Sequence, residues 1–140
     1  MEKIIQLLRK HEGVEKHAYT CSAGYVTIGV GRNIDEVGGL GLSDEEINFL
    51  LKNDIERCIV ELTIAFDWFE GLDEVRKDAM INLVFNLGLS RLMKFEKALF
   101  AMSNQDWETA SEEFLDSRWA EQVGARATEV AQMIRTGEYI

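Results

Sequence analysis

HEGVEKHAYTCSAGYVTIGVGRN, residues 11–33, combines the end of a helix with two short strand-like segments. The helix is predicted over residues 2–12, where apolar side chains recur at helical spacing, and Gly13 directly after it favours a left-handed C-terminal cap. Beyond Gly13 the apolar pattern alternates and glycines interrupt it, which is typical of a small antiparallel sheet. We therefore predict a small β-containing lobe over about residues 13–42.

Three polar residues of this stretch stand at the spacing E-x8-C-x5-T, namely Glu12, Cys21 and Thr27. Glu12 ends the predicted helix, Cys21 falls near a turn and Thr27 on a strand. An acid, a polar group and a hydroxyl placed in this way can converge on one cleft, which suits acid-catalysed hydrolysis. The opposing interpretation is that Glu12 is only a solvated residue at a helix end, and from position alone that is the commoner case.

Two other chemistries involve the same stretch. His11, His17 and Cys21 carry nitrogen and sulfur donors, but their spacing fits no zinc pattern and a fourth ligand is missing. A nucleophilic pair of Cys21 with His17 would need a thiol pKa well below about 8.5, and no cation is placed to lower it. We therefore expect no metal and no cofactor, and two free thiols at Cys21 and Cys58.

The composition excludes some partners. The 140 residues carry a net charge of −10 without a cluster of Lys and Arg, so we expect no nucleic-acid binding. No apolar run approaches the roughly 20 residues that span a bilayer, so stable membrane insertion is not expected. The N-terminal apolar run is too short for a secretion signal, which predicts accumulation in the cytoplasm.

The remaining chain is predicted to be helical. Ser43 and Glu46 form a capping-box pattern that opens a long helix over about residues 43–62, expected to connect two lobes. A helix begun by Asp73 is apolar on nearly all faces, which is typical of a core helix. Shorter helices follow, predicted at residues 89–94, 96–104, 107–115, 118–122 and 125–136. The prediction is an α+β fold whose all-helical C-terminal lobe comprises residues 63–140 together with the helix of residues 2–12.

The segments LLRKHEG, GYVTIGVGR, DEVRKDAMINLVFNLG, SRWAEQ and RTG, in this order, resemble the T-even phage lysozymes. These are the phage-type lysozymes or endolysins of glycoside hydrolase family 24. The resemblance covers nearly the whole chain, and the main difference is a shorter connection between Asn33 and Ser43. It implies a lysozyme-like fold and muramidase activity, the hydrolysis of the β-1,4 bond between N-acetylmuramic acid and N-acetylglucosamine in bacterial peptidoglycan.

By position, the resemblance makes Glu12 the general acid and Thr27 a residue that holds the attacking water. Cys21 occupies the place where the family usually has aspartate. An inverting glycosidase needs a carboxylate base about 6.5–9.5 Å from its acid, and a neutral thiol is a poor substitute. We hypothesise that Cys21 and Thr27 position water while Glu12 dominates the rate; whether the reaction inverts or retains configuration is left open.

The resemblance also assigns supporting roles. Arg126 matches an arginine that pairs with the catalytic glutamate, and Arg32 replaces a histidine whose acidic partner matches Asp54. An Arg32–Asp54 pair would tie the sheet to the long helix. The positions that touch saccharide in relatives are matched by Asn33, Phe85, Asn86 and Gln122, to which we add Tyr25 near the hairpin tip. Phe85 is equally well explained as a core residue, and Ala98 stands where relatives have another polar cleft residue.

The implied role is that of an endolysin in host cell lysis. It would be a monomer that waits in the host cytoplasm and needs a holin to reach the periplasm and cell wall, and its lobes would hinge about the long helix. One alternative is a non-catalytic peptidoglycan-binding or virion structural module that lost the chemistry through Cys21. Another is a lytic transglycosylase, which uses an acid such as Glu12 but no water.

Overall fold

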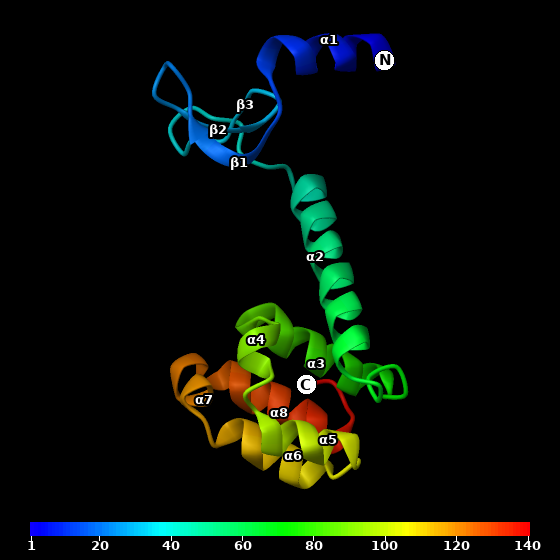
Figure 1. The fold of residues 1–140 in the computed structure, drawn as a ribbon. Coiled ribbons are helices and arrows are strands. Elements are labelled where there is room, and N and C mark those ends of the chain that lie inside the picture. The colour runs from blue at the N-terminus through cyan, green and yellow to red at the C-terminus, as the bar shows by residue number, and fades with distance from the viewer. The chain divides into compact units, whose positions relative to one another are not determined.

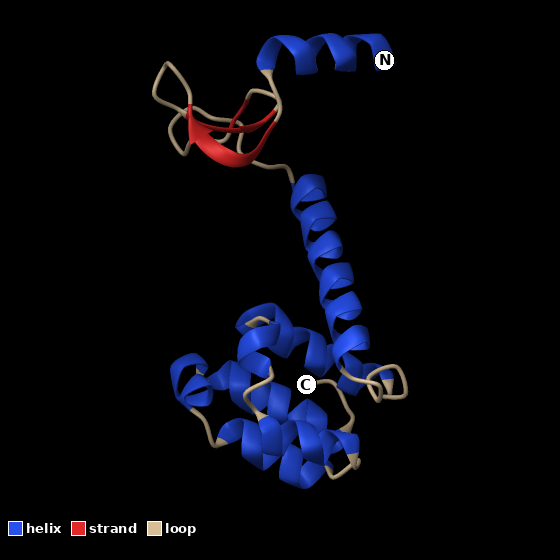
Figure 2. Ribbon diagram, in the orientation of Figure 1, coloured by secondary structure: helices blue, strands red, loops and turns tan.

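The computed structural model describes all 140 residues and contains eight helices and one three-stranded sheet (Figures 1 and 2). This composition confirms the predicted α+β class. The chain divides into two compact units, Met1–Leu50 and Leu51–Ile140. The predicted lobe boundaries, the assignment of the first helix to the helical lobe and the connecting role of the long helix stay predictions. In chain order the elements are α1 (Glu2–Glu12), β1 (Glu15–Thr20), β2 (Val26–Gly29), β3 (Arg32–Asn33), α2 (Asp44–Ala65), α3 (Glu74–Leu87), α4 (Leu89–Leu92), α5 (Glu96–Ser103), α6 (Trp107–Leu115), α7 (Arg118–Val123) and α8 (Ala125–Thr136).

In the first unit, α1 leads directly into the antiparallel sheet β1-β2-β3. Gly13 ends α1, and its N–H donates to the Arg9 carbonyl at 3.0 Å. Its φ of 78° is positive, but its ψ of 173° is extended, so the predicted left-handed cap geometry is wrong. The extended ψ suits the entry into β1, because a left-handed cap would turn the chain away from a strand conformation.

The long helix α2 begins with the predicted capping box. The Ser43 N–H donates to Glu46 Oε1 at 2.9 Å, and the Glu46 N–H donates to Ser43 Oγ at 3.2 Å. Two of the amide groups at the start of the helix are thereby satisfied. No helix of the chain combines the length and the apolar character that crossing a bilayer requires.

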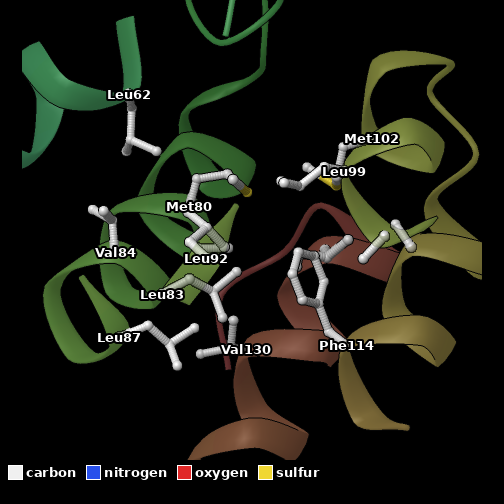
Figure 3. Close-up of a cluster of buried hydrophobic side chains, with 14 of the residues drawn as sticks. Leu62, Met80, Leu83, Val84, Leu87, Leu92, Leu99, Met102, Phe114 and Val130 are labelled. Carbon is white, nitrogen blue, oxygen red and sulfur yellow. The ribbon is translucent and has the colours of Figure 1, made fainter. Parts of the chain in front are cut away.

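The second unit is organised around α3, as predicted for an apolar core helix. Asp73 caps it by accepting from the Arg76 N–H at 3.1 Å. Figure 3 shows the apolar side chains of α3, among them Met80 and Leu83, packed with side chains such as Phe114 and Val130 of other helices. The helix α8 packs against both α3 and α6, and α5 packs against α6. The observed boundaries of α4 to α8 agree with the predicted ones to within two residues.

Candidate active site

Glu12 is the last residue of α1, and its carboxyl group lies against the turn that joins β2 to β3. A Cβ atom placed on Gly31 of this turn would come within 2.9 Å of Glu12 Oε2. Gly31 also has a φ of +66°, which L-residues with a side chain rarely adopt. Glycine at position 31 therefore suits the turn, and a side chain there would have to displace the Glu12 carboxyl group.

Thr27 lies at the centre of the sheet. It pairs with Tyr19 of β1 on one side and with Asn33 of β3 on the other. At 4% exposure it is the only buried residue of the first unit, and its Oγ1 donates to the Tyr25 carbonyl at 3.0 Å. Its hydroxyl is therefore held in one orientation by the backbone of the β1–β2 connection.

Cys21 follows β1 directly and is half-buried. Its N–H donates to the Tyr25 carbonyl at 2.9 Å, the same oxygen that accepts from Thr27, so the two candidate residues share one anchor. Hydrogen bonding from the backbone of Tyr25, and then of Ala23, holds the pKa of the Cys21 thiol below its usual range. The Thr27 hydroxyl also lowers this pKa, while burial opposes the shift.

This acidified thiol is the feature of the site that the sequence analysis missed. No side-chain cation in the sequence is placed to lower the pKa of this thiol. Backbone N–H groups in a tight turn can stabilise an anion in the same way. The signal was present in Ser22-Ala23-Gly24, where the glycine adopts a φ of +89° and its N–H donates to the Cys21 carbonyl at 2.9 Å.

Asn33 and Tyr25 both accept hydrogen bonds that shape the loops beside the site. The Asn33 side-chain oxygen accepts from the Asp35 N–H at 2.9 Å, and its carbonyl accepts from the Leu40 N–H at 2.8 Å. These bonds fold the loop after β3 back onto the strand. Tyr25 as a residue is 43% exposed, and its carbonyl anchors Cys21 and Thr27. The contact of either side chain with saccharide stays a prediction.

Within the first unit Arg32 pairs with Glu46, and its predicted pairing with Asp54, a residue of the second unit, stays a prediction. Arg32 Nη1 donates to Glu46 Oε1 at 2.7 Å, and Asp54 instead pairs with Arg57 on its own helix. Glu46 lies in the first turn of α2, where the capping box holds its carboxylate beside Ser43. A carboxylate already fixed near the end of the loop needs little further ordering to accept the arginine, whereas Asp54 lies more than two turns further along the helix.

The other predicted residues belong to the second unit. Arg126 Nε donates to Asn82 Oδ1 at 3.0 Å, and both residues line a hollow of about 330 Å³. Phe85 lines the same hollow and is 46% exposed, so its interpretation as a core residue is wrong. Asn86 Oδ1 accepts from Trp119 Nε1 at 2.6 Å, while Gln122 is exposed. The pairing of Arg126 with the catalytic glutamate stays a prediction.

Ala98, where relatives have a polar cleft residue, is 1% exposed in the second unit's core. Both cysteines are free, as predicted, and burial raises the pKa of the Cys58 thiol. No group of three or more His, Cys, Asp or Glu side chains has an arrangement that could hold a metal ion. The first unit thus brings together an acid, an acidified thiol and a fixed hydroxyl around one small sheet.

A carboxyl group beside a thiol and a fixed hydroxyl is compatible with general acid catalysis of hydrolysis. Residues 9–135 match the phage lysozyme family, and the chain belongs to this family. It is 28% identical to "Probable T4-type lysozyme 1" of Dictyostelium discoideum, over 98% of this chain and 96% of that protein. It is 27% identical to "Endolysin" of Acyrthosiphon pisum secondary endosymbiont phage 1, over 96% of this chain and 89% of that protein.

The chain is also 28% identical to "Pre-baseplate central spike protein Gp5" of Enterobacteria phage T4. This match covers 94% of the chain but only 27% of that protein. The fold is therefore lysozyme-like, as predicted, and the protein is a lysozyme-type glycosidase that acts on peptidoglycan.

Proposed function

We propose that the protein is a muramidase that hydrolyses the β-1,4 bond between N-acetylmuramic acid and N-acetylglucosamine. Glu12 is its general acid, and Cys21 and Thr27 position the attacking water. The observation that carries this assignment is the Tyr25 carbonyl that anchors both Cys21 and Thr27, in the same small sheet whose β2–β3 turn contacts Glu12 at Gly31.

In the proposed reaction, Glu12 donates its proton to the glycosidic oxygen as the bond between that oxygen and the anomeric carbon breaks. Thr27 and Cys21 hold a water molecule that adds to the anomeric carbon. The proton that this water loses passes to the Cys21 sulfur once the thiol has ionised, and hydrogen bonds from the surrounding turn lower the pKa of that thiol. The thiolate thereby takes the part that a carboxylate base plays in other glycosidases.

The decisive test measures the release of reducing ends from purified peptidoglycan. Glu12→Gln keeps the size of the side chain but has no proton to donate, so the rate is expected to fall about 10²–10⁴-fold. Cys21→Ala is expected to lose less, and Cys21→Asp to remain active. If Cys21→Ala loses as much activity as Glu12→Gln, the ranking of the two residues is wrong.

The same products separate hydrolysis from lytic transglycosylation. A transglycosylase leaves anhydro-muramic ends, because an intramolecular hydroxyl replaces water. Reducing ends that incorporate oxygen from isotopically labelled water support hydrolysis. Anhydro ends without that label would contradict the proposal and would leave Cys21 and Thr27 without their proposed role.

We propose host cell lysis as the biological role, with storage in the host cytoplasm and holin-dependent release of a monomer to the cell wall. A virion-borne role is a second candidate, favoured by the match to the central spike protein of phage T4. Detection of the protein in purified virions, or only in the lysate, distinguishes these two roles. A non-catalytic wall-binding module would bind peptidoglycan and release no ends.

A further inference from the structure

We propose that the second unit carries a separate saccharide-binding site. The site is a hollow near the start of α3 and the connection between α5 and α6, and two tryptophans line it. This tryptophan hollow has a volume of about 430 Å³ and is lined by Trp68 and Trp107 together with polar side chains including Asp73, Ser103 and Gln105. Its volume lies in the range of small-molecule sites. Binding here requires neither Glu12 nor Cys21, so the site goes beyond the proposed cleavage.

The two indole rings are held before any ligand arrives. Trp68 stacks on Phe66 with 4.8 Å between the ring centroids, and the Arg76 guanidinium lies 4.2 Å from the centre of the Trp107 ring. Arg76 is itself fixed, because its Nε donates to the Ile134 carbonyl at 2.6 Å. Rigid aromatic rings offer apolar area at a low cost in conformational entropy, which suits stacking against the C–H face of a pyranose ring.

The charges around the hollow select a neutral ligand. Asp73 is the only charged residue that lines it, and its carboxylate already pairs with Arg76 at 3.0 Å. No basic side chain lines the hollow, and the Arg76 guanidinium beside it is already engaged by Asp73 and the Trp107 ring. The carboxylate, the Ser103 hydroxyl and the Gln105 amide can instead exchange hydrogen bonds with hydroxyl and acetamido groups. An uncharged N-acetylated saccharide combines these groups with an apolar ring face.

Gln105 provides a second, independent observation. It is the only residue other than glycine with a positive φ, at 59°. It occupies the position after the end of α5 where glycine is favoured, since the Asp106 N–H donates to the Ala101 carbonyl and the Gln105 N–H to the Met102 carbonyl. Glutamine is strained there, and residues held in such conformations concentrate at binding and catalytic sites. The strain is explained if its side chain is needed in the tryptophan hollow.

The test uses the Glu12→Gln variant, so that no saccharide is cleaved, and tetra-N-acetylchitotetraose as the probe. The chain has three tryptophans, and their indole N–H resonances can be followed separately by NMR. Saturable shifts at Trp68 and Trp107 are expected. Trp119 donates to Asn86, a predicted substrate residue that does not line the hollow, so its resonance reports on binding elsewhere in the second unit. Shifts confined to Trp119 would overturn the proposal.

Gln105→Gly separates binding from folding. Relief of the backbone strain is expected to raise the melting temperature by about 2–4 °C, while the loss of the amide weakens saccharide binding in the hollow about fivefold. Trp68→Ala is expected to weaken it more than tenfold. The matched controls are Gln132→Ala on α8 and Phe100→Ala on α5, neither of which lines the hollow. Unchanged affinity in Gln105→Gly would overturn the proposal.

Two further outcomes keep this proposal distinct from the muramidase assignment. Shifts at Trp68 and Trp107 in a protein that releases no reducing ends would support the site while contradicting the cleavage. Release of reducing ends without those shifts would support the cleavage and contradict the saccharide site in the hollow. Shifts of Trp68 and Trp107 caused by a neutral tetrapeptide and absent with the chitotetraose would assign the hollow to peptide and overturn the saccharide proposal.

Discussion

The two units of this protein are stabilised in different ways. Every buried apolar side chain lies in Leu51–Ile140, whereas Thr27 is the only buried residue of Met1–Leu50. The first unit depends on strand pairing, turns and loop hydrogen bonds, such as those the Asp35 carboxylate accepts from the Val26 and Val37 N–H groups at 3.0 Å. A cavity in a helical core costs stability, while a turn-rich sheet depends on the conformations of individual residues. Substitutions should therefore lower the unfolding free energy most in the second unit, and alter local conformation and activity in the first.

The largest effect is expected in the core of the second unit. Phe114 is 1% exposed and its ring packs against Phe95 at 5.4 Å between centroids. Phe114→Ala removes this buried area and leaves a cavity, which is expected to cost about 3–5 kcal/mol of unfolding free energy. Urea unfolding followed by circular dichroism measures the change. Phe100→Ala, at a residue that is 70% exposed, should stay within about 0.5 kcal/mol; equal losses would contradict the assigned core.

In the first unit a single methyl group is expected to remove activity without affecting the core. Gly31→Ala places a Cβ atom 2.9 Å from Glu12 Oε2 at a φ of +66°. The backbone strain costs about 1–2 kcal/mol, and displacement of the general acid should reduce reducing-end release more than tenfold. Gly38→Ala is the matched control, because its φ is +78° and a Cβ there meets nothing within 4 Å. It should show the strain and keep the activity; equal loss of activity in both variants would contradict the contact with Glu12.

The rate of reducing-end release should depend on pH through the ionisation of the Cys21 thiol. Because the turn lowers the pKa of Cys21 below its ordinary value of 9.0, the thiolate forms at lower pH than in a free cysteine. Reducing-end release by the wild type should rise as the thiol ionises, and Cys21→Asp should lack this rise because a carboxylate is already ionised there. Rates for both proteins are measured across the same pH range. An identical pH profile for the two would show that Cys21 does not act as a base.

The sequence predicted features whose cause is local and missed those that depend on how a turn folds. The capping box at Ser43, the helix start at Asp73 and the apolar faces of α3 are encoded within a few neighbouring residues, and the structure confirms them. The acidified thiol of Cys21 arises from amide groups that converge only once the turn has formed. The pairing of Arg32 with Glu46 was not predicted, because several acidic residues of α2 could accept the guanidinium and only the folded loop places Glu46 beside it.

The smallest effect is expected at this Arg32–Glu46 pair, which ties β3 to α2. The Arg32 guanidinium, together with the backbone N–H and hydroxyl of Ser43, lowers the pKa of Glu46 from 4.5 to about 2. A carboxylate whose pKa falls on folding stabilises the fold above its unfolded value, and that stability is lost as the pH drops through the folded value. Wild type should therefore exceed Glu46→Gln in stability at neutral pH, and the difference should shrink between pH 4.5 and about 2.

Both Glu46 and its partner are partly exposed, with side-chain exposures of 38% and 36%, so salt should weaken the effect. Amide hydrogen exchange of the Met1–Leu50 unit is the suitable measurement, because global unfolding is dominated by the core of the other unit. Asp54→Asn is the matched control: its carboxylate pairs with the exposed Arg57 and should leave exchange in β3 unchanged. If Asp54→Asn accelerates exchange in β3 as much as Glu46→Gln does, the sequence-based assignment of Asp54 as the partner of Arg32 was right in solution.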